Sequence, residues 1–232
     1  MEIKFATLTG ADDNSNIEDI HNLSKKYPFV EWGILFHKNK NGISRYPSKE
    51  WIEKLKPISK EINLSAHLCG NWVHEMRYGD IPFLKEPISE IFKRIQINCF
   101  GEMLEQVLFS ENKFWDCKFD RPFMIGGSYK ENIPIELFLE KGISPLFDCS
   151  GGRGITPESW EKPVKGLFCG YAGGLNPSNL ERQLKNIEDT VGNAEIWIDM
   201  ETGIRNNDDM FDFKLCEEVL EIVGKYKWDK VF

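Results

Sequence analysis

The sequence has no run of apolar residues long enough to cross a lipid bilayer, which takes about 18 consecutive residues. Its first residues, MEIKFATLTG, lack the basic region and apolar stretch that mark a secretory signal peptide. Positive charge is also scarce, since 29 Lys and Arg residues face 37 Asp and Glu residues, for a formal net charge of −8. Because nucleic acids require a basic surface, we expect a cytoplasmic protein with neither a nucleic acid nor a membrane as partner.

The six cysteines are scattered along the chain, and none of them belongs to a CxxC pair. This spacing argues against a zinc site and against a disulfide framework, and it is typical of reduced thiols in the cytoplasm. We therefore expect neither a metal nor a cofactor. A metal triad of His37, His67 and Asp148 is an alternative, but their positions along the chain do not determine whether the three side chains converge.

What the sequence does have is an alternation of short apolar runs with amphipathic stretches. Eight apolar runs predict β-strands, at residues 3–8, 30–36, 62–68, 94–100, 122–128, 144–150, 166–172 and 195–201. Apolar residues at helical spacing lie between most of them, at residues 16–27, 48–58, 101–109, 133–142, 176–192 and 214–226. Residues 71–91 are the least regular and predict a loop with a short helix.

Such alternation is typical of parallel sheets with right-handed crossovers between the strands. Eight units within 232 residues predict an α/β protein with the (β/α)8 TIM-barrel fold. A doubly wound open sheet is the alternative, although the sequence does not mark the reversal of strand order that this fold requires. No linker or change of composition divides the chain, so we expect residues 1–232 to form a single domain.

Two predicted strands end in glycine-containing loops. The strand at 166–172 runs into Gly173 and Gly174, and the last strand runs into Thr202 and Gly203. In a parallel barrel these two loops meet at the carboxyl face, where backbone amides commonly hold a phosphate. Each loop alone also fits a simple tight turn, whereas the two together favour phosphate binding. The expected partner is therefore a small phosphorylated ligand.

Four stretches share the residue order of one known family: ISRYPSKEW (43–51), PLFDCSGGRGITPESW (145–160), YAGGLNPSNL (171–180) and IDMETGIR (198–205). In these stretches the chain resembles phosphoribosylanthranilate isomerase, a ribulose-phosphate-binding barrel of tryptophan synthesis. The resemblance implies that Asp148 is a general acid and that Arg45 contacts the substrate. It also implies that the last two stretches supply the phosphate loops.

The chain departs from this family at two strand ends. The family has a cysteine as general base in its first strand, in a Lys-Ile-Cys-Gly-Leu-Thr pattern, and Ala6 stands there in IKFATLTG. The fourth strand of the family ends near Leu-His-Gly, where this chain has Asn98 and Cys99. Alanine cannot accept a proton, so we expect the fold and the phosphate site to be shared with the family and the substrate to differ.

Three residues are candidates for catalysis. Asp148 follows an apolar strand, where partial burial would raise the pKa of the carboxyl group and suit it to general-acid work; it could instead cap the following loop. His67 and Cys69 lie two residues apart on one side of a strand, so either could replace the missing base. Both could also be ordinary buried residues of the barrel.

Four further residues are candidates for substrate binding: Arg45, Asn98, Asp199 and Arg205. Guanidinium groups suit phosphates and carboxylates, which favours Arg205, together with Arg153, whereas Arg45 is a candidate because the family resemblance implies it. Asp199 could bind a sugar hydroxyl, or it could be a buried partner of Lys4 on the neighbouring first strand.

Three functions fit this pattern. The first is an enzyme, an isomerase or lyase that acts on a sugar phosphate or a sugar-linked metabolite through Asp148 and a base from another strand. The second is a non-catalytic relative that senses a phosphorylated ligand, which the missing cysteine favours. The third is a structural protein without a small ligand, which the retained loops argue against. The aromatic content also allows a homodimer surface.

Overall fold

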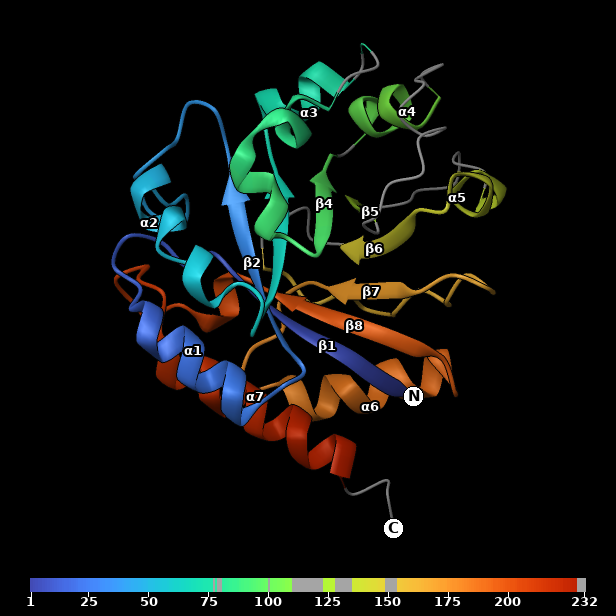
Figure 1. Cartoon of the computed structure of the whole chain (residues 1–232). Coiled ribbons are helices and arrows are strands. Elements are labelled where there is room, and N and C mark those ends of the chain that lie inside the picture. Colours follow the sequence, from blue (N-terminus) through green and yellow to red (C-terminus); the bar gives the residue numbers. More distant parts are fainter. Residues whose placement is uncertain are drawn as a thin grey trace.

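The computed structural model describes residues 1–76, 78, 81–99, 101–109, 123–127, 135–148 and 154–228. Each strand pairs in parallel with the next, and the last pairs with the first, so that the strands form a closed ring (Figure 1). The strands are β1 (Glu2–Thr9), β2 (Val30–Phe36), β3 (Asn63–Leu68), β4 (Arg94–Asn98), β5 (Phe123–Gly127), β6 (Ser144–Asp148), β7 (Cys169–Ala172) and β8 (Glu195–Met200). The predicted α/β fold with a curled parallel sheet is confirmed.

Helices pack around this ring, with α1, α6 and α7 along one side of it and α3, α4 and α5 at the other end of the view (Figure 1). None of the described helices is both long enough and apolar enough to cross a membrane. The α-helices are α1 (Ile17–Lys26), α2 (Lys49–Glu53), α3 (Asn71–Met76), α4 (Glu102–Phe109), α5 (Ile135–Lys141), α6 (Leu180–Val191) and α7 (Phe213–Trp228). Shorter 3₁₀ helices are η1 (Lys56–Ile58), η2 (Pro82–Lys85), η3 (Pro87–Ile91) and η4 (Thr202–Ile204).

The sequence shows no helical pattern in the connection between β6 and β7. The described part of this connection, residues 154–168, forms no helix, so the alternation of strand and helix is incomplete there. Pro157 and Pro163 explain this locally, because each lacks a backbone N–H and restricts the residue before it. Trp160 and Val164 nevertheless pack into the hydrophobic core, so the loop covers the barrel in place of a helix.

Two helices begin or end at other residues than the sequence predicts. The predicted helix 176–192 begins at Leu180, because Asn176 N–H donates to Asn179 Oδ1 (3.0 Å) in a preceding turn. The predicted helix 48–58 is divided into α2 and η1, with Pro57 in the second part. Its serine cap is confirmed, since Ser48 Oγ accepts a hydrogen bond from Trp51 N–H at 3.1 Å.

The inside of the barrel is polar at the amino ends of the strands, which the sequence patterns did not predict. Arg94 Nη1 donates to both carboxylate oxygens of Glu31, at 3.0 and 3.1 Å, and both side chains are buried. Thr7 Oγ1 donates to the same carboxylate at 2.8 Å. The Arg94 guanidinium also lies 4.5 Å from the centre of the Trp197 ring, so charge and aromatic packing close this end of the barrel.

The orientation of β1 determines which way the side chain of Ala6 points. Thr7 and Thr9 point into the barrel, where they bond Glu31 and Asp199. Because successive side chains of a strand alternate between its faces, Ala6 faces the helices instead, and it is fully buried there. The expectation that Ala6 occupies the position of a catalytic side chain is therefore wrong. The inward neighbours of Ala6 on β1 carry no acid or base, so β1 still supplies no base.

Candidate active site

A cavity of about 270 Å³ opens at the carboxyl ends of the strands. Most of the side chains predicted to form the site line it, and they come from β3, β4, β6 and β8 and the loops that follow them. Those in the lining are His67, Cys69, Asn98, Asp148, Asp199 and Thr202, with Gly173, Gly174 and Gly203. Arg45 and Arg205 are not part of this lining.

The glycines after β7 and β8 are required by the close packing of three loops. A Cβ on Gly203 would lie 1.9 Å from the carbonyl oxygen of Leu175, which no side chain could tolerate. Gly174 has φ +60°, and a Cβ there would lie 2.5 Å from the amide nitrogen of Thr156. The loops after β6, β7 and β8 therefore touch through backbone atoms, as an anion-binding backbone site also requires.

Backbone amides of these loops are available to a ligand. Within the described residues, the N–H groups of Gly174, Leu175, Thr202 and Gly203 donate no hydrogen bond. Such amides at strand ends attract an anion without any basic side chain. This matters because, among the described residues, the charged lining of the cavity consists of Asp148, Asp199 and Glu201, without a lysine or arginine. A phosphate would have to sit on the amides, away from these carboxylates.

Asp199 is held by hydrogen bonds from both sides of the barrel. Thr9 Oγ1 donates to Oδ1 at 2.7 Å, and Gln96 Nε2 approaches Oδ2 at 3.3 Å. Burial raises the pKa of the Asp199 carboxyl to about 7, and the charges of Glu201 and Asp148 add to the rise. Lys4 pairs with Glu2 and Glu195 instead, so the alternative of an Asp199–Lys4 pair is not formed.

His67 lies in the same polar layer, with both ring nitrogens occupied. Nδ1 accepts from Gln96 Nε2 at 3.1 Å, and Nε2 lies 3.0 Å from Ser65 Oγ. Burial, together with the charge of Arg94, lowers the pKa of the imidazole to about 3. The ring is therefore neutral at physiological pH, and its hydrogen bond with Gln96 links it to Asp199.

Cys69 and Asn98 form a pair at the mouth of the cavity. Asn98 Nδ2 donates to Cys69 Sγ at 3.3 Å, and Asn98 Oδ1 accepts from Gln96 Nε2 at 3.0 Å. Burial raises the pKa of the Cys69 thiol to about 11. A thiol of this kind remains protonated near neutral pH, whereas proton abstraction would require the thiolate.

Asp148 ends β6 on the side of the cavity next to the β7 loop. A Cβ placed on Gly173 would lie 3.9 Å from Asp148 Oδ1. Its charge is close enough to Asp199 to help raise the pKa of that carboxyl group. The structure therefore brings together two carboxylates from β6 and β8 in one cavity, beside the available amides.

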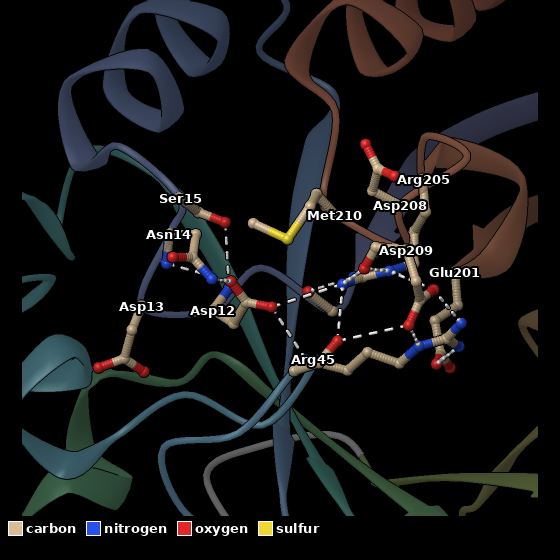
Figure 2. A network of polar contacts seen from close by, with 12 residues as sticks. Asp12, Asp13, Asn14, Ser15, Arg45, Glu201, Arg205, Asp208, Asp209 and Met210 are labelled. Atoms are coloured by element: carbon tan, nitrogen blue, oxygen red, sulfur yellow. Dashed lines mark hydrogen bonds and ion pairs between the residues drawn. The ribbon is translucent and has the colours of Figure 1, made fainter.

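Arg45 and Arg205 instead form an ionic network that ties three loops together beside the cavity (Figure 2). Arg205 Nη1 donates to the carbonyl oxygen of Gly10 at 2.8 Å, and Nε donates to Asp209 Oδ1 at 3.0 Å. Arg45 bridges Glu201 (2.7 Å) and Asp209 (2.6 Å), and it lies 3.4 Å from Thr202 Oγ1. Arg45 is thus near the predicted phosphate loop, while Arg205 is buried within the protein.

The remaining candidates do not meet at this cavity. His37 lines a neighbouring groove and not the cavity that holds His67 and Asp148. No group of three His, Cys, Asp or Glu side chains suited to a metal occurs in the described parts of the chain. Arg153 lies outside the described residues. The signal that sequence reasoning missed is Gln96, a polar residue inside a predicted strand that bonds the side chains of three other strand residues.

Comparisons with known proteins identify similar folds. No family model matches the chain, and no curated protein matches its sequence. Phosphoribosyl anthranilate isomerase from Thermus thermophilus superposes with a TM-score of 0.61 at 15% identity, covering 96% of this chain and 99% of that one. TrpF from Jonesia denitrificans gives 0.60 at 14% identity, covering 95% and 97%. A truncated 3-deoxy-D-arabino-heptulosonate 7-phosphate synthase from Thermotoga maritima gives 0.50 at 14% identity, covering 96% and 86%. The resemblance to phosphoribosylanthranilate isomerase is thereby confirmed at the level of the fold.

Proposed function

We propose that this chain is a (β/α)8-type barrel enzyme that binds a phosphorylated sugar, or a metabolite linked to one, and acts on it as an isomerase or lyase. The observation that carries this proposal is the combination of two features in one cavity. Backbone amides after β7 and β8 suit a phosphate, and the carboxylates of Asp148 and Asp199 suit proton transfer. The similar folds named above include enzymes whose names refer to phosphorylated compounds.

Asp199 and Asp148 are the acid–base pair of this proposal. Isomerisation of a sugar phosphate removes a proton from the carbon beside a carbonyl group, while a second group protonates the carbonyl oxygen. With its pKa raised to about 7, Asp199 exchanges a proton at neutral pH, as either step requires. Asp148 takes the complementary role. The reaction balances because the removed proton returns to the neighbouring carbon, and the group that protonated the carbonyl oxygen takes a proton back from the adjacent hydroxyl group as the new carbonyl forms.

His67 and Cys69 have a different part in this scheme. The ring nitrogens of His67 are both occupied, and the thiol of Cys69 holds its proton, so neither is suited to be the base. We assign both to positioning, since Gln96 and Asn98 link them to Asp199. Arg45, beside Thr202, is assigned to the negative end of the substrate.

A second candidate function is ligand sensing without catalysis. The observation that favours it is the interior of β1, where Thr7 and Thr9 carry no acid or base. We expect Asp148→Asn to separate the two. An enzyme should lose about 10²- to 10⁴-fold in kcat and keep its affinity for the sugar phosphate within a few-fold. Assays of turnover and of binding by calorimetry on the same samples make this comparison. A wild-type protein that binds sugar phosphates without converting any of them would support the sensor instead.

The phosphate site is tested by Gly203→Ala. The added Cβ would push the β8 loop away from Leu175, so we expect the affinity for inorganic phosphate to fall by about tenfold or more. Isothermal titration in phosphate-free buffer, well below the melting temperature, measures this. Asn193→Ala is the control, because Asn193 is exposed in the turn before β8, at the opposite end of that strand from Gly203. Equal affinity of the Gly203→Ala variant and the wild type would contradict the proposed phosphate site.

A further inference from the structure

A second and larger cavity lies beside the candidate active site. It has a volume of about 480 Å³ and is enclosed by the end of β2, by α2 and by the segment of η2 and η3. Leu35 and Tyr46 line both cavities, so that they form a partition between the two. The volume of this cavity falls within the usual range for small-molecule sites. The proposed acid–base chemistry does not involve this cavity. We refer to it as the lateral groove.

One wall of the lateral groove is aromatic. Phe36 and Phe83 meet edge to face with ring centres 4.7 Å apart, and Trp72 meets Phe83 at 5.8 Å and 86°. Phe83 is buried, whereas Phe36 and Trp72 are partly exposed, and the ammonium group of Lys38 lies 4.5 Å from the centre of the Trp72 ring. Such a wall favours a flat apolar ring, because ring packing adds to the burial of apolar surface.

The rim of the lateral groove carries lysines, in a protein whose formal net charge is −8. Lys38 already pairs with Glu75 at 2.5 Å. Within the described residues Lys40 and Lys49 have no carboxylate partner, although Lys40 lies 5.0 Å from the centre of the Tyr46 ring.

Two carboxylates also line the lateral groove, Glu53 and Glu86. Glu53 is neutralised by Lys56 at 2.5 Å, which leaves Glu86 against two available ammonium groups. Among the described residues, the lining of the groove therefore carries a positive surplus that the lining of the active-site cavity lacks, and this surplus suits a carboxylate.

We propose that the lateral groove is a separate binding site for a flat aromatic carboxylate. The ring lies against Phe36, Trp72 and Phe83, and the carboxylate faces Lys40 and Lys49. A neutral apolar ligand would leave the lysines unused, and a phosphate without a ring would leave the aromatic wall unused. The active-site cavity and the lateral groove can be filled at the same time, because Tyr46 and Leu35 stand between them.

The test uses 2-naphthoate as the probe and 2-naphthalenemethanol as its neutral analogue. Calorimetric titration of the full chain should show one saturable site for 2-naphthoate and weaker binding of the alcohol. For the double variant K40Q/K49Q we expect about tenfold weaker binding of 2-naphthoate, from the loss of two charged hydrogen bonds at an open site. The alcohol should bind this variant and the wild type equally. The matched control, K54Q/K60Q, removes two exposed lysines outside the lining and should leave both affinities unchanged.

Two further measurements complete the test. Trp72→Leu should weaken both probes, because it changes the aromatic wall and leaves the charge intact. Saturating inorganic phosphate should leave the affinity for 2-naphthoate unchanged, so failure of the phosphate site and failure of the lateral groove are seen separately. The proposal is overturned if the two probes bind equally well, if K40Q/K49Q binds 2-naphthoate like the wild type, or if no saturable binding occurs at millimolar concentration.

Discussion

Replacing Arg205 by methionine should lower the free energy of unfolding by about 3–5 kcal/mol, because it removes one partner of a buried ion pair. The side chains of Arg205 and Asp12 are 1% and 2% exposed, and Nη2 lies 3.4 Å from Asp12 Oδ2. Methionine fills a similar volume but leaves Asp12 and the carbonyl of Gly10 without this donor. For a chain of this size, the melting temperature should fall by roughly 6–20 °C.

Thermal denaturation followed by circular dichroism measures this effect. Arg182→Met, an exposed position on α6, is the control and should change the melting temperature little. The experiment also decides between two roles for Arg205, because a substrate-binding arginine would lose affinity without a loss of stability. A variant with wild-type stability and weaker ligand binding would instead support the substrate-binding role that the sequence predicted for Arg205.

Asp199→Asn should abolish most of the activity and, at alkaline pH, stabilise the protein. Loss of an acid–base group lowers kcat by about 10²- to 10⁴-fold. The effect on stability follows from the pKa, which is about 7 in the folded protein against 3.8 as the ordinary value. Between these values the folded state holds the proton and the unfolded state releases it, so stability falls as the pH rises from 4 to 7.

Above pH 7 the cost of burying this carboxylate is complete, on the order of 4 kcal/mol. Asparagine does not ionise, so the variant avoids that cost. This gain in stability is larger than the loss from a weaker hydrogen bond to Gln96. The variant should therefore melt above the wild type at alkaline pH and lose this advantage in acid. Calorimetric melting at both pH values, with the exposed Asp208→Asn as control, checks it. A difference between variant and wild type that does not depend on pH would contradict the raised pKa.

The strands were predictable because each one is a local pattern. A run such as VEWGILF needs no knowledge of the rest of the chain, and it is β2 within its predicted bounds. Glycine at 173, 174 and 203 also signals locally, since it marks a backbone that a side chain would obstruct. The sequence did not show which atoms a side chain at these positions would meet. The structure shows that they are the carbonyl oxygen of Leu175 at Gly203 and the amide nitrogen of Thr156 at Gly174.

Sequence by itself thus determined the order of the strands, their parallel pairing and the loops that could hold a phosphate, because periodicity and glycine act over a few residues. The tertiary structure decided which side chains meet. Thr9 and Asp199 lie 190 positions apart and meet because β8 closes on β1. The same closure buries His67 as a neutral ring and turns Arg205 inward. Burial and partners set the charge of a side chain, and both come from contacts between distant segments of the chain.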